Sequence, residues 1–233
     1  MRILLIPVSI MLFFTSTRAL GSWDVITFTK DGAIYDGSYY YINVSSSAHV
    51  DMYGGYSDNV GITEQGKFYL YEGTIGSTEY GRVNIQDYGQ YYQYGGNVHS
   101  IYSIEKGEVF IYGGGVEGVE LKNDSKVYVY NKVDTIVALV GGEVHIYGWF
   151  FVYTETNVFD LYGRGFSNLR VYRNYSDYNN YYDIKLLDYW KPPSYPDVIR
   201  TIDHVYFHTI PEPTTLSLFF LGAFLAGRKR RMV

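Results

Sequence analysis

Tyrosine is the residue type best placed to do chemistry in this sequence, because it recurs at a nearly constant spacing. The chain has 28 tyrosines among 233 residues. Tyr112, Tyr130 and Tyr147 each end the same short motif, which is a glycine or serine, a charged residue and then alternating apolar residues. A row of such flat amphipathic rings could stack against sugar rings. The rings could instead pack against one another between neighbouring strands. The sequence leaves both interpretations open.

Carboxylates are the residues that would indicate an enzyme. Five of them lie near candidate strands and could converge on one face, as general acid–base cleavage of a polysaccharide requires. They are Asp87, Glu105, Glu117, Glu120 and Glu143. Such an enzyme would also need arginine or lysine near an acidic substrate, whereas the basic residues here are scattered along the strand starts. Charges repeated at strand ends are typical of a solvated edge, so we expect no catalytic residues and no enzyme activity.

Cofactor and metal sites are not indicated. The chain has no cysteine, which excludes a thiolate metal site and a cysteine nucleophile. Residues 113–118 match glycine-x-glycine-x-x-glycine, but a strand pattern follows where a dinucleotide site needs a helix. His204 and His208 have the spacing of a helical metal pair, yet the residues between them favour a strand, on which the pair would lie about 13 Å apart. We expect no cofactor and no metal.

The elements that carry these residues are predicted to be β-strands. Between Trp23 and Thr209 the chain is rich in tyrosine, valine, isoleucine and glycine and poor in good helix formers, which favours strands and tight turns. The strand motif recurs, and its copies start at residues 66, 81, 107, 125 and 142. Looser copies lie at residues 50–53, 158–162 and 169–172.

A unit of about 17 residues cannot bury its apolar face alone, so we predict that the units stack into an all-β, parallel β-helix-like solenoid. Period-2 alternation places Val109 and Ile111 on the inner face, and Phe110 and Tyr112 on the outer face. Roughly seven to nine coils are expected. The alternative is a β-sandwich of antiparallel strands, but a sandwich gives no reason for one motif to recur at nearly constant spacing.

The solenoid body is predicted to span residues 22–209, with irregular caps at both ends. Residues 22 to about 47 would close the N-terminal end. Residues 174–209, where the repeat is lost, would close the C-terminal end and leave no bare strand edge. Residues 90–96 are interpreted as an insertion into one repeat.

Residues 1–21 are predicted to be a secretory signal peptide. Arg2 precedes an apolar run over residues 3–14, and Ala19 and Gly21 are small residues at the spacing of a cleavage site. Twelve apolar residues are few for a membrane span. The chain is therefore expected to be exported and cleaved by signal peptidase.

Residues 210–233 form a second targeting signal with three ordered parts. Pro211, Glu212 and Pro213 come first, and an apolar stretch over residues 216–227 follows. The stretch predicts a transmembrane helix, but one that rises only about 18 Å against a hydrocarbon core of about 30 Å. Such a helix suits a transient membrane intermediate better than a permanent anchor. A cluster of cations, which would stay on the cytoplasmic side, closes the chain: Arg228, Lys229, Arg230 and Arg231.

This tail resembles the PEP-CTERM sorting signal of Gram-negative bacteria. The resemblance implies that a membrane-embedded exosortase-type protease recognises and removes the tail. The protein would then pass from the inner membrane to the cell surface or to the exopolysaccharide matrix of a biofilm. The repeats also resemble the Val-x-Ile-Tyr-Gly-Gly coils of bacterial PEP-CTERM surface proteins with β-helix bodies, although the glycine pair follows Tyr112 and not Tyr130 or Tyr147. The family is a targeting class and implies no single activity.

The charge of the body limits its partners. Residues 22–209 hold 13 basic and 23 acidic residues, a net charge of −10. This argues against nucleic acid and against anionic membranes. We expect a structural or adhesive protein of the cell surface or matrix, with extracellular polysaccharide as a candidate partner. A carbohydrate-binding module that uses Tyr112, Tyr130 and Tyr147 is the first alternative, and a polysaccharide lyase or hydrolase is the second.

Overall fold

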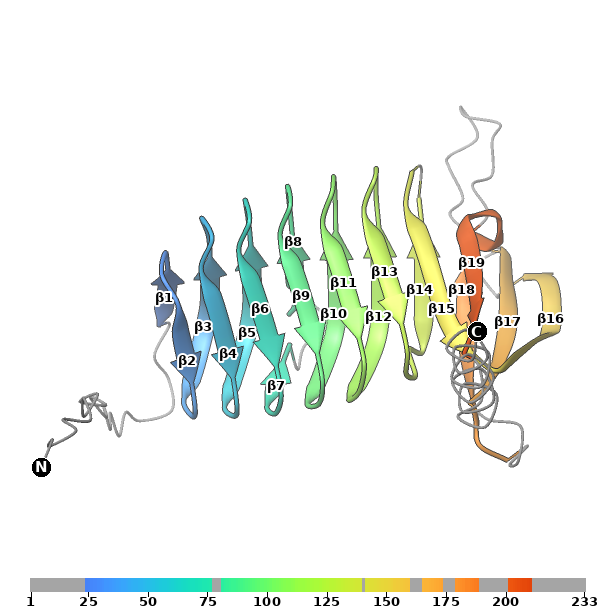
Figure 1. The fold of residues 1–233 in the computed structure, drawn as a ribbon, viewed down its shortest axis with the longest axis horizontal. Coiled ribbons are helices and arrows are strands. Elements are labelled where there is room, and N and C mark those ends of the chain that lie inside the picture. Colours follow the sequence, from blue (N-terminus) through green and yellow to red (C-terminus); the bar gives the residue numbers. More distant parts are fainter. Residues whose placement is uncertain are drawn as a thin grey trace, which may run out of the picture.

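The chain folds into a β-solenoid of about six turns, which confirms the predicted fold class (Figure 1). The computed structural model describes six ranges of the chain: 24–76, 81–139, 141–159, 165–173, 179–188 and 201–210. The predicted signal peptide and nearly all of the predicted sorting tail lie outside these ranges. No helix in the described part of the chain is long and apolar enough to cross a membrane.

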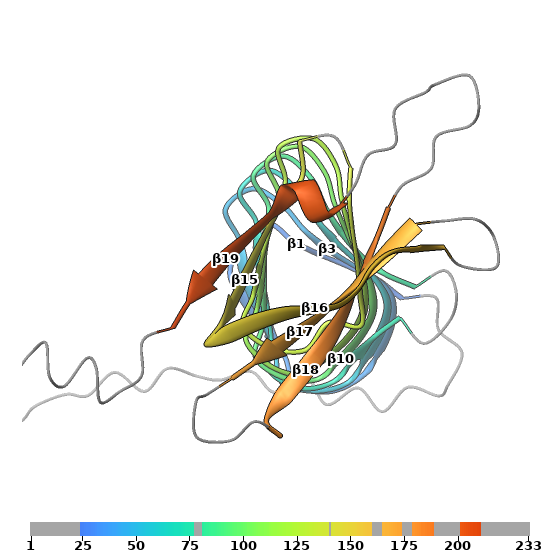
Figure 2. The same ribbon diagram turned by 90° about the vertical axis from the view of Figure 1, so that its right-hand side faces the viewer.

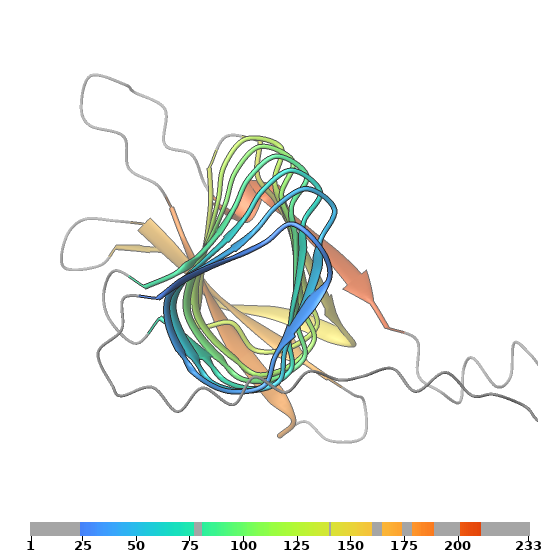
Figure 3. The ribbon, with the colours of Figure 1, turned by 90° about the vertical axis from the view of Figure 1, so that its left-hand side faces the viewer.

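Two parallel sheets wind around one core, and each turn gives one strand to each sheet, as the end-on view in Figure 3 shows. The parallel strands of sheet A are β1 (Val25–Phe28), β3 (Ser38–Val44), β5 (Tyr56–Ile62), β7 (Thr74–Ile75), β8 (Val83–Ile85), β10 (Asn97–Ser103), β12 (Gly115–Leu121) and β14 (Thr135–Ala138). Sheet B consists of β2 (Gly32–Ile34), β4 (His49–Met52), β6 (Lys67–Leu70), β9 (Gln90–Gln93), β11 (Glu108–Ile111), β13 (Lys126–Val129), β15 (Glu143–Gly148) and β19 (Val205–Thr209).

The core is a stack of like residues. Val109 pairs with Val127, and Val127 pairs with Val144, so the same inward position repeats from turn to turn. All three valines are fully buried. Each buried aliphatic side chain contributes about 1.5–3 kcal/mol relative to exposure, so the solenoid is stabilised in small equal steps. The outward residues of the same strands are only partly covered, as the alternation predicted.

Glycine is required at one corner of each turn, because the backbone of the preceding turn lies close. Gly114, which follows β11, has a φ of 76°. A Cβ atom at this position would lie 2.5 Å from the carbonyl oxygen of Gly96 on the preceding turn. Only glycine can adopt this left-handed conformation without a steric penalty. This corner therefore holds consecutive turns at a fixed separation.

One interval in the repeat is longer than the others, and its position corrects a prediction. Most register steps are 17 or 18 residues, but Lys67 of β6 pairs with Gln90 of β9, 23 residues away. The additional residues lie between β7 and β8, which both pair with β5 and β10 in sheet A. Residues 90–96 are thus a regular strand and corner, not an insertion. Residues 81–85 belong to sheet A and are not a copy of the sheet B strand.

The two ends differ from the predicted caps. The N-terminal residues expected to form a cap contain β1, β2 and β3, which are strands of the solenoid itself. At the other end the parallel path stops at Gly148, earlier than predicted. β16 (Phe150–Phe159), β17 (Gly165–Tyr172) and β18 (Tyr181–Leu187) form an antiparallel meander across the end of the solenoid (Figure 2). The looser repeat copies near residues 158–172 are antiparallel strands, so there are fewer turns than the seven to nine expected.

Candidate functional site: the aromatic face of sheet B

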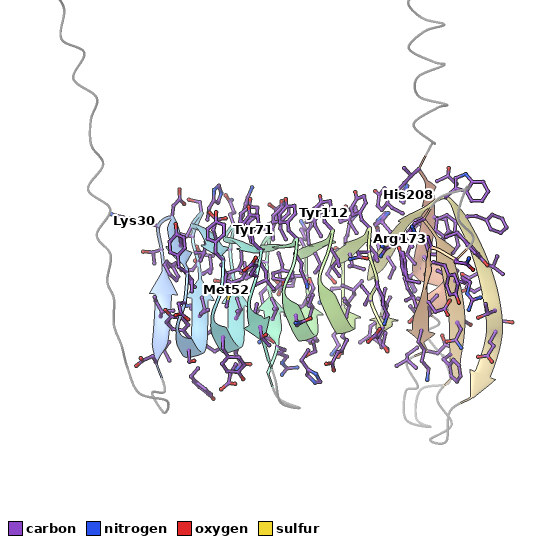
Figure 4. All side chains as sticks on the ribbon, turned by 90° about the horizontal axis from the view of Figure 1, so that it is seen from below. Lys30, Met52, Tyr71, Tyr112, Arg173 and His208 are labelled. Carbon is purple, nitrogen blue, oxygen red and sulfur yellow. The ribbon has the colours of Figure 1, made fainter. Side chains whose placement is uncertain are left out.

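A row of stacked rings runs along the outer face of sheet B, and we call it the first row. Its neighbouring rings have centroids 4.1–5.3 Å apart and planes that differ by only 9–19°. Figure 4 shows Tyr71, Tyr112 and His208 of this row on one side of the molecule. The first row consists of Tyr35, Tyr53, Tyr71, Tyr94, Tyr112, Tyr130, Tyr147 and His208. The structure therefore places the three tyrosines predicted from the sequence next to one another.

A second row of rings lies beside the first, two residues earlier on each strand. Residues i and i+2 of a strand project from the same face, so each turn gives one ring to each row. Neighbouring rings of the second row have centroids 4.6–5.0 Å apart and planes within 5–18° of each other. The second row consists of Tyr69, Tyr92, Phe110, Tyr128, His145 and Tyr206.

The stacking decides which atoms the face presents. Each ring covers part of the face of its neighbour, so the surface consists of ring edges, the uncovered parts of the ring faces and phenolic hydroxyl groups. Side chains stand roughly perpendicular to a sheet, which makes the hydroxyl the outermost group of a tyrosine. Tyr94 and Tyr112 are 46% and 40% exposed, so the first row is open to a ligand. The face is amphipathic along its whole length.

The phenols of both rows stay neutral at physiological pH. Burial, with the neighbouring Tyr69 and Glu108, raises the pKa of Tyr92 to about 12. Burial and a hydrogen bond with Tyr147 raise the pKa of Tyr130. A neutral phenol both donates and accepts hydrogen bonds. The face therefore offers a line of uncharged hydroxyl groups.

Charges at the strand starts flank the second row and neutralise one another. Lys126 Nζ lies 2.8 Å from Glu143 Oε2 on the next turn. Gln90 Nε2 donates to Glu108 Oε2 over 2.7 Å. The hydrogen bond from Lys126 lowers the pKa of Glu143, which therefore stays ionised near neutral pH. Because cations and anions alternate here, this flank forms no strip of one charge.

The C-terminal end of the face is held by a pair of histidines that the sequence did not reveal. His145 Nδ1 of β15 lies 3.0 Å from His208 Nε2 of β19, and His145 Nε2 lies 3.2 Å from Glu143 Oε2. His204, which we expected on the same strand as His208, instead ends a short 3₁₀ helix, η1 (Thr201–His204). Within the described ranges no group of histidine and carboxylate side chains could hold a metal ion.

We predict that this junction loses stability in mild acid. Burial lowers the pKa of His145 in the folded protein. The unfolded state therefore binds more protons than the folded state as the pH falls below the usual histidine pKa of about 6.5. The stabilisation is complete above that pH and declines below it. The unfolding temperature, measured from pH 7.5 down to about pH 5, should fall less for His145→Phe than for the native protein. His99→Gln, on sheet A, should keep the native pH profile, and equal profiles for all three proteins would contradict the prediction.

The carboxylates considered for catalysis do not gather on one face. Asp87 and Glu105 lie at a corner, where both have a positive φ. On sheet A, Glu117 lies 2.7 Å from His99, and Glu120 Oε1 lies 3.1 Å from Lys122 Nζ. Glu143 is on sheet B. A hollow of about 360 Å³ over sheet A includes Glu117 but none of the other four.

The comparison with protein families decides what the C-terminus is. Residues 209–231 match the PEP-CTERM protein-sorting motif. The chain carries a PEP-CTERM sorting motif. It is thus an exported protein that an exosortase-type system handles at the membrane, as the resemblance implied. The comparison with curated proteins gave no match, and neither did the comparison with solved structures.

The PEP-CTERM motif begins where the solenoid ends. Thr209 is the last residue of β19 and the first residue of the motif. The backbone N–H of Ile210 still donates to the carbonyl oxygen of Gly148 over 2.9 Å. Pro211, Glu212 and Pro213 follow directly, inside the matched residues but outside the described part of the chain. The basic residues 228–231 also fall within the match.

Proposed function

We propose that this protein is a non-enzymatic structural and adhesive element of the bacterial cell surface or of the extracellular polysaccharide matrix. The observation that carries the proposal is the continuous aromatic face of sheet B, on which the first row extends from Tyr35 to His208. Large contiguous exposed patches of this kind mark interaction surfaces. An exported protein that carries one is suited to attach to other components outside the cell.

The rigidity of the face supports an adhesive role. Each ring is held between the rings of the two neighbouring turns, and each turn is held by the strand hydrogen bonds of both sheets. Offset-stacked aromatic pairs contribute about 0.5–1.5 kcal/mol each beyond their buried area. A surface that is already ordered loses little side-chain entropy when it binds. The dispersed carboxylates favour binding over catalysis.

The proposal predicts that the face is needed for retention outside the cell. In a host strain that lacks the native gene, the triple variant Tyr112→Ala, Tyr130→Ala and Tyr147→Ala should be exported and processed normally. Its amount in the surface and matrix fractions should fall about fivefold, with a matching rise in the medium, because the centre of the binding patch is lost. Quantitative immunoblots of the three fractions measure this.

A matched control removes three tyrosines from other surfaces. Tyr41 and Tyr102 lie on sheet A and Tyr88 at a corner, so their replacement by alanine removes the same chemical groups from outside the aromatic face. This control should be retained like the native protein. Equal retention of both triple variants would show that the aromatic face is not the adhesive surface.

A carbohydrate-binding module is the second candidate function. The observation that favours it is the row of neutral, exposed phenols, because sugars offer both hydroxyl groups and apolar ring faces to such a surface. Adhesion to a polysaccharide matrix and binding of its glycan are compatible, since the second would be the means of the first.

A further inference from the structure

We infer that the aromatic face binds a linear, neutral polysaccharide that lies along the solenoid axis and places about one sugar residue on each turn. This inference rests on the proposed adhesive role of the face and specifies its ligand. It follows from the period of the rings, the chemistry of the exposed groups, the charge around them and the size of the face.

The period of the face runs along the solenoid axis. Ring centroids recur every 4.1–5.3 Å, once for each strand of sheet B. This distance is set by the spacing of neighbouring strands, about 4.7–4.9 Å. It is similar to the length of one sugar residue in an extended glycan chain. The two rows lie two residues apart on each strand, or about 7 Å, which is similar to the width of a pyranose ring.

The groups that recur with this period suit a sugar. Each tyrosine of the first row offers an uncharged hydroxyl, which can donate to and accept from sugar hydroxyls. The ring edges and the uncovered parts of the ring faces offer apolar surface to sugar C–H groups. Phe110 shows that the second row does not need a hydroxyl at every turn, since it stacks between Tyr92 and Tyr128 with both centroid distances at 4.7 Å. Hydrogen bonding by the first row is therefore the more regular feature.

The charge of the body selects a neutral glycan. A uronic acid polymer would need a line of cations, but Lys126 is paired with Glu143, and Glu108 lies between Lys126 and Gln90 on the same flank. The body as a whole has a net charge of −10. A polyanion would be repelled over a Debye length of about 8 Å at physiological salt. A neutral chain meets no such repulsion.

The size of the face argues against a second copy of this protein as the occupant. Sheet B has eight strands, so its length is roughly 34 Å, and its outer side-chain rows span about 14 Å. Two such faces in contact would bury roughly 1,000 Å², below the range of about 1,200–2,000 Å² that is usual for stable protein pairs. A polysaccharide differs because each additional sugar contacts a further turn.

Binding of oligosaccharides of defined length tests the inference. The protein isolated from the host surface fraction is titrated calorimetrically with cello-, manno- and laminari-oligosaccharides of two to six sugars. For at least one series the dissociation constant should fall at least about tenfold from the dimer to the hexamer. Hexagalacturonate should bind at least about tenfold more weakly than that neutral hexamer in about 0.15 M salt.

Removal of hydroxyl groups alone assigns the binding to this face. The double variant Tyr112→Phe and Tyr130→Phe keeps the stacked rings and should keep the native unfolding temperature. Its affinity for the neutral hexamer should fall about fivefold, because each lost hydrogen bond contributes about 0.5–1.5 kcal/mol. The double variant Tyr41→Phe and Tyr102→Phe removes two hydroxyls from sheet A and should bind like the native protein.

Three results would overturn the inference. They are the absence of length-dependent binding in all three neutral series, tighter binding of hexagalacturonate, and a dimer in sedimentation that the alanine triple variant abolishes. These results are separate from the test of the proposed function. A protein that binds no glycan but still needs its aromatic face for retention would be an adhesive element with a different partner.

Discussion

Gly114→Val is expected to destabilise the solenoid by at least about 3 kcal/mol. A non-glycine residue at a φ of 76° costs about 1–3 kcal/mol in backbone strain, and a β-branched residue suffers most. The new Cβ would also lie 2.5–2.6 Å from the carbonyl oxygens of Gly96 and Gly95. These are backbone atoms of the preceding turn, so the two turns would have to separate. Separation would also disturb the stacking of Tyr94 on Tyr112, whose centroids are 5.1 Å apart.

Gly118→Ala is the matched control, four residues further along the same turn. A Cβ at Gly118 meets no atom within 4 Å. The substitution should therefore be neutral or should stabilise the protein by up to about 1 kcal/mol, because alanine restricts the unfolded chain. Urea unfolding followed by circular dichroism measures both changes. If both variants unfold at the same midpoint, the glycine corner is not what fixes the separation of the turns.

The sequence predicted the core of the solenoid because each inward position repeats its residue type. Val109, Val127 and Val144 occupy one stacked position, and the spacing of their motifs was visible without a structure. The same pattern could not say which sheet a strand joins. Val83–Ile85 has the apolar-x-apolar spacing of a sheet B strand, but it lies in sheet A. Alternation reports that one face is buried, and that holds for both sheets and for antiparallel strands alike.

The aromatic face was predicted only in part for a related reason. Tyr112, Tyr130 and Tyr147 were found because they share one residue type at intervals of 18 and 17 residues. The second row escaped detection since its rings differ in type, with Phe110 and His145 among the tyrosines. A search for any planar ring two residues before each first-row tyrosine would have found it. The pairing of His145 with His208 spans 63 residues and depends on β19 returning to β15, which no local pattern contains.

Replacement of Pro211, Glu212 and Pro213 by alanine is expected to stop sorting without changing the fold. The matched motif identifies these residues with the signal that an exosortase-type system recognises. The unprocessed chain should accumulate in the membrane fraction, and the surface form should fall at least about tenfold. Intact-mass measurement of each fraction distinguishes the chain that keeps residues 228–231 from the processed form. The unfolding temperature of the body should be unchanged, since the described strand hydrogen bonds end with the N–H of Ile210.

A second variant separates loss of the signal from loss of two prolines. Pro192→Ala with Pro193→Ala removes the same residue type 18 residues before the end of β19 and should be processed normally. If the alanine-substituted tail were still removed, the matched proline–glutamate–proline residues would not be what the protease reads. Recognition would then have to depend on the apolar stretch and the terminal cations. If the variant instead stays in the membrane with its solenoid intact, targeting and folding are independent, because β19 completes sheet B before the motif's first proline.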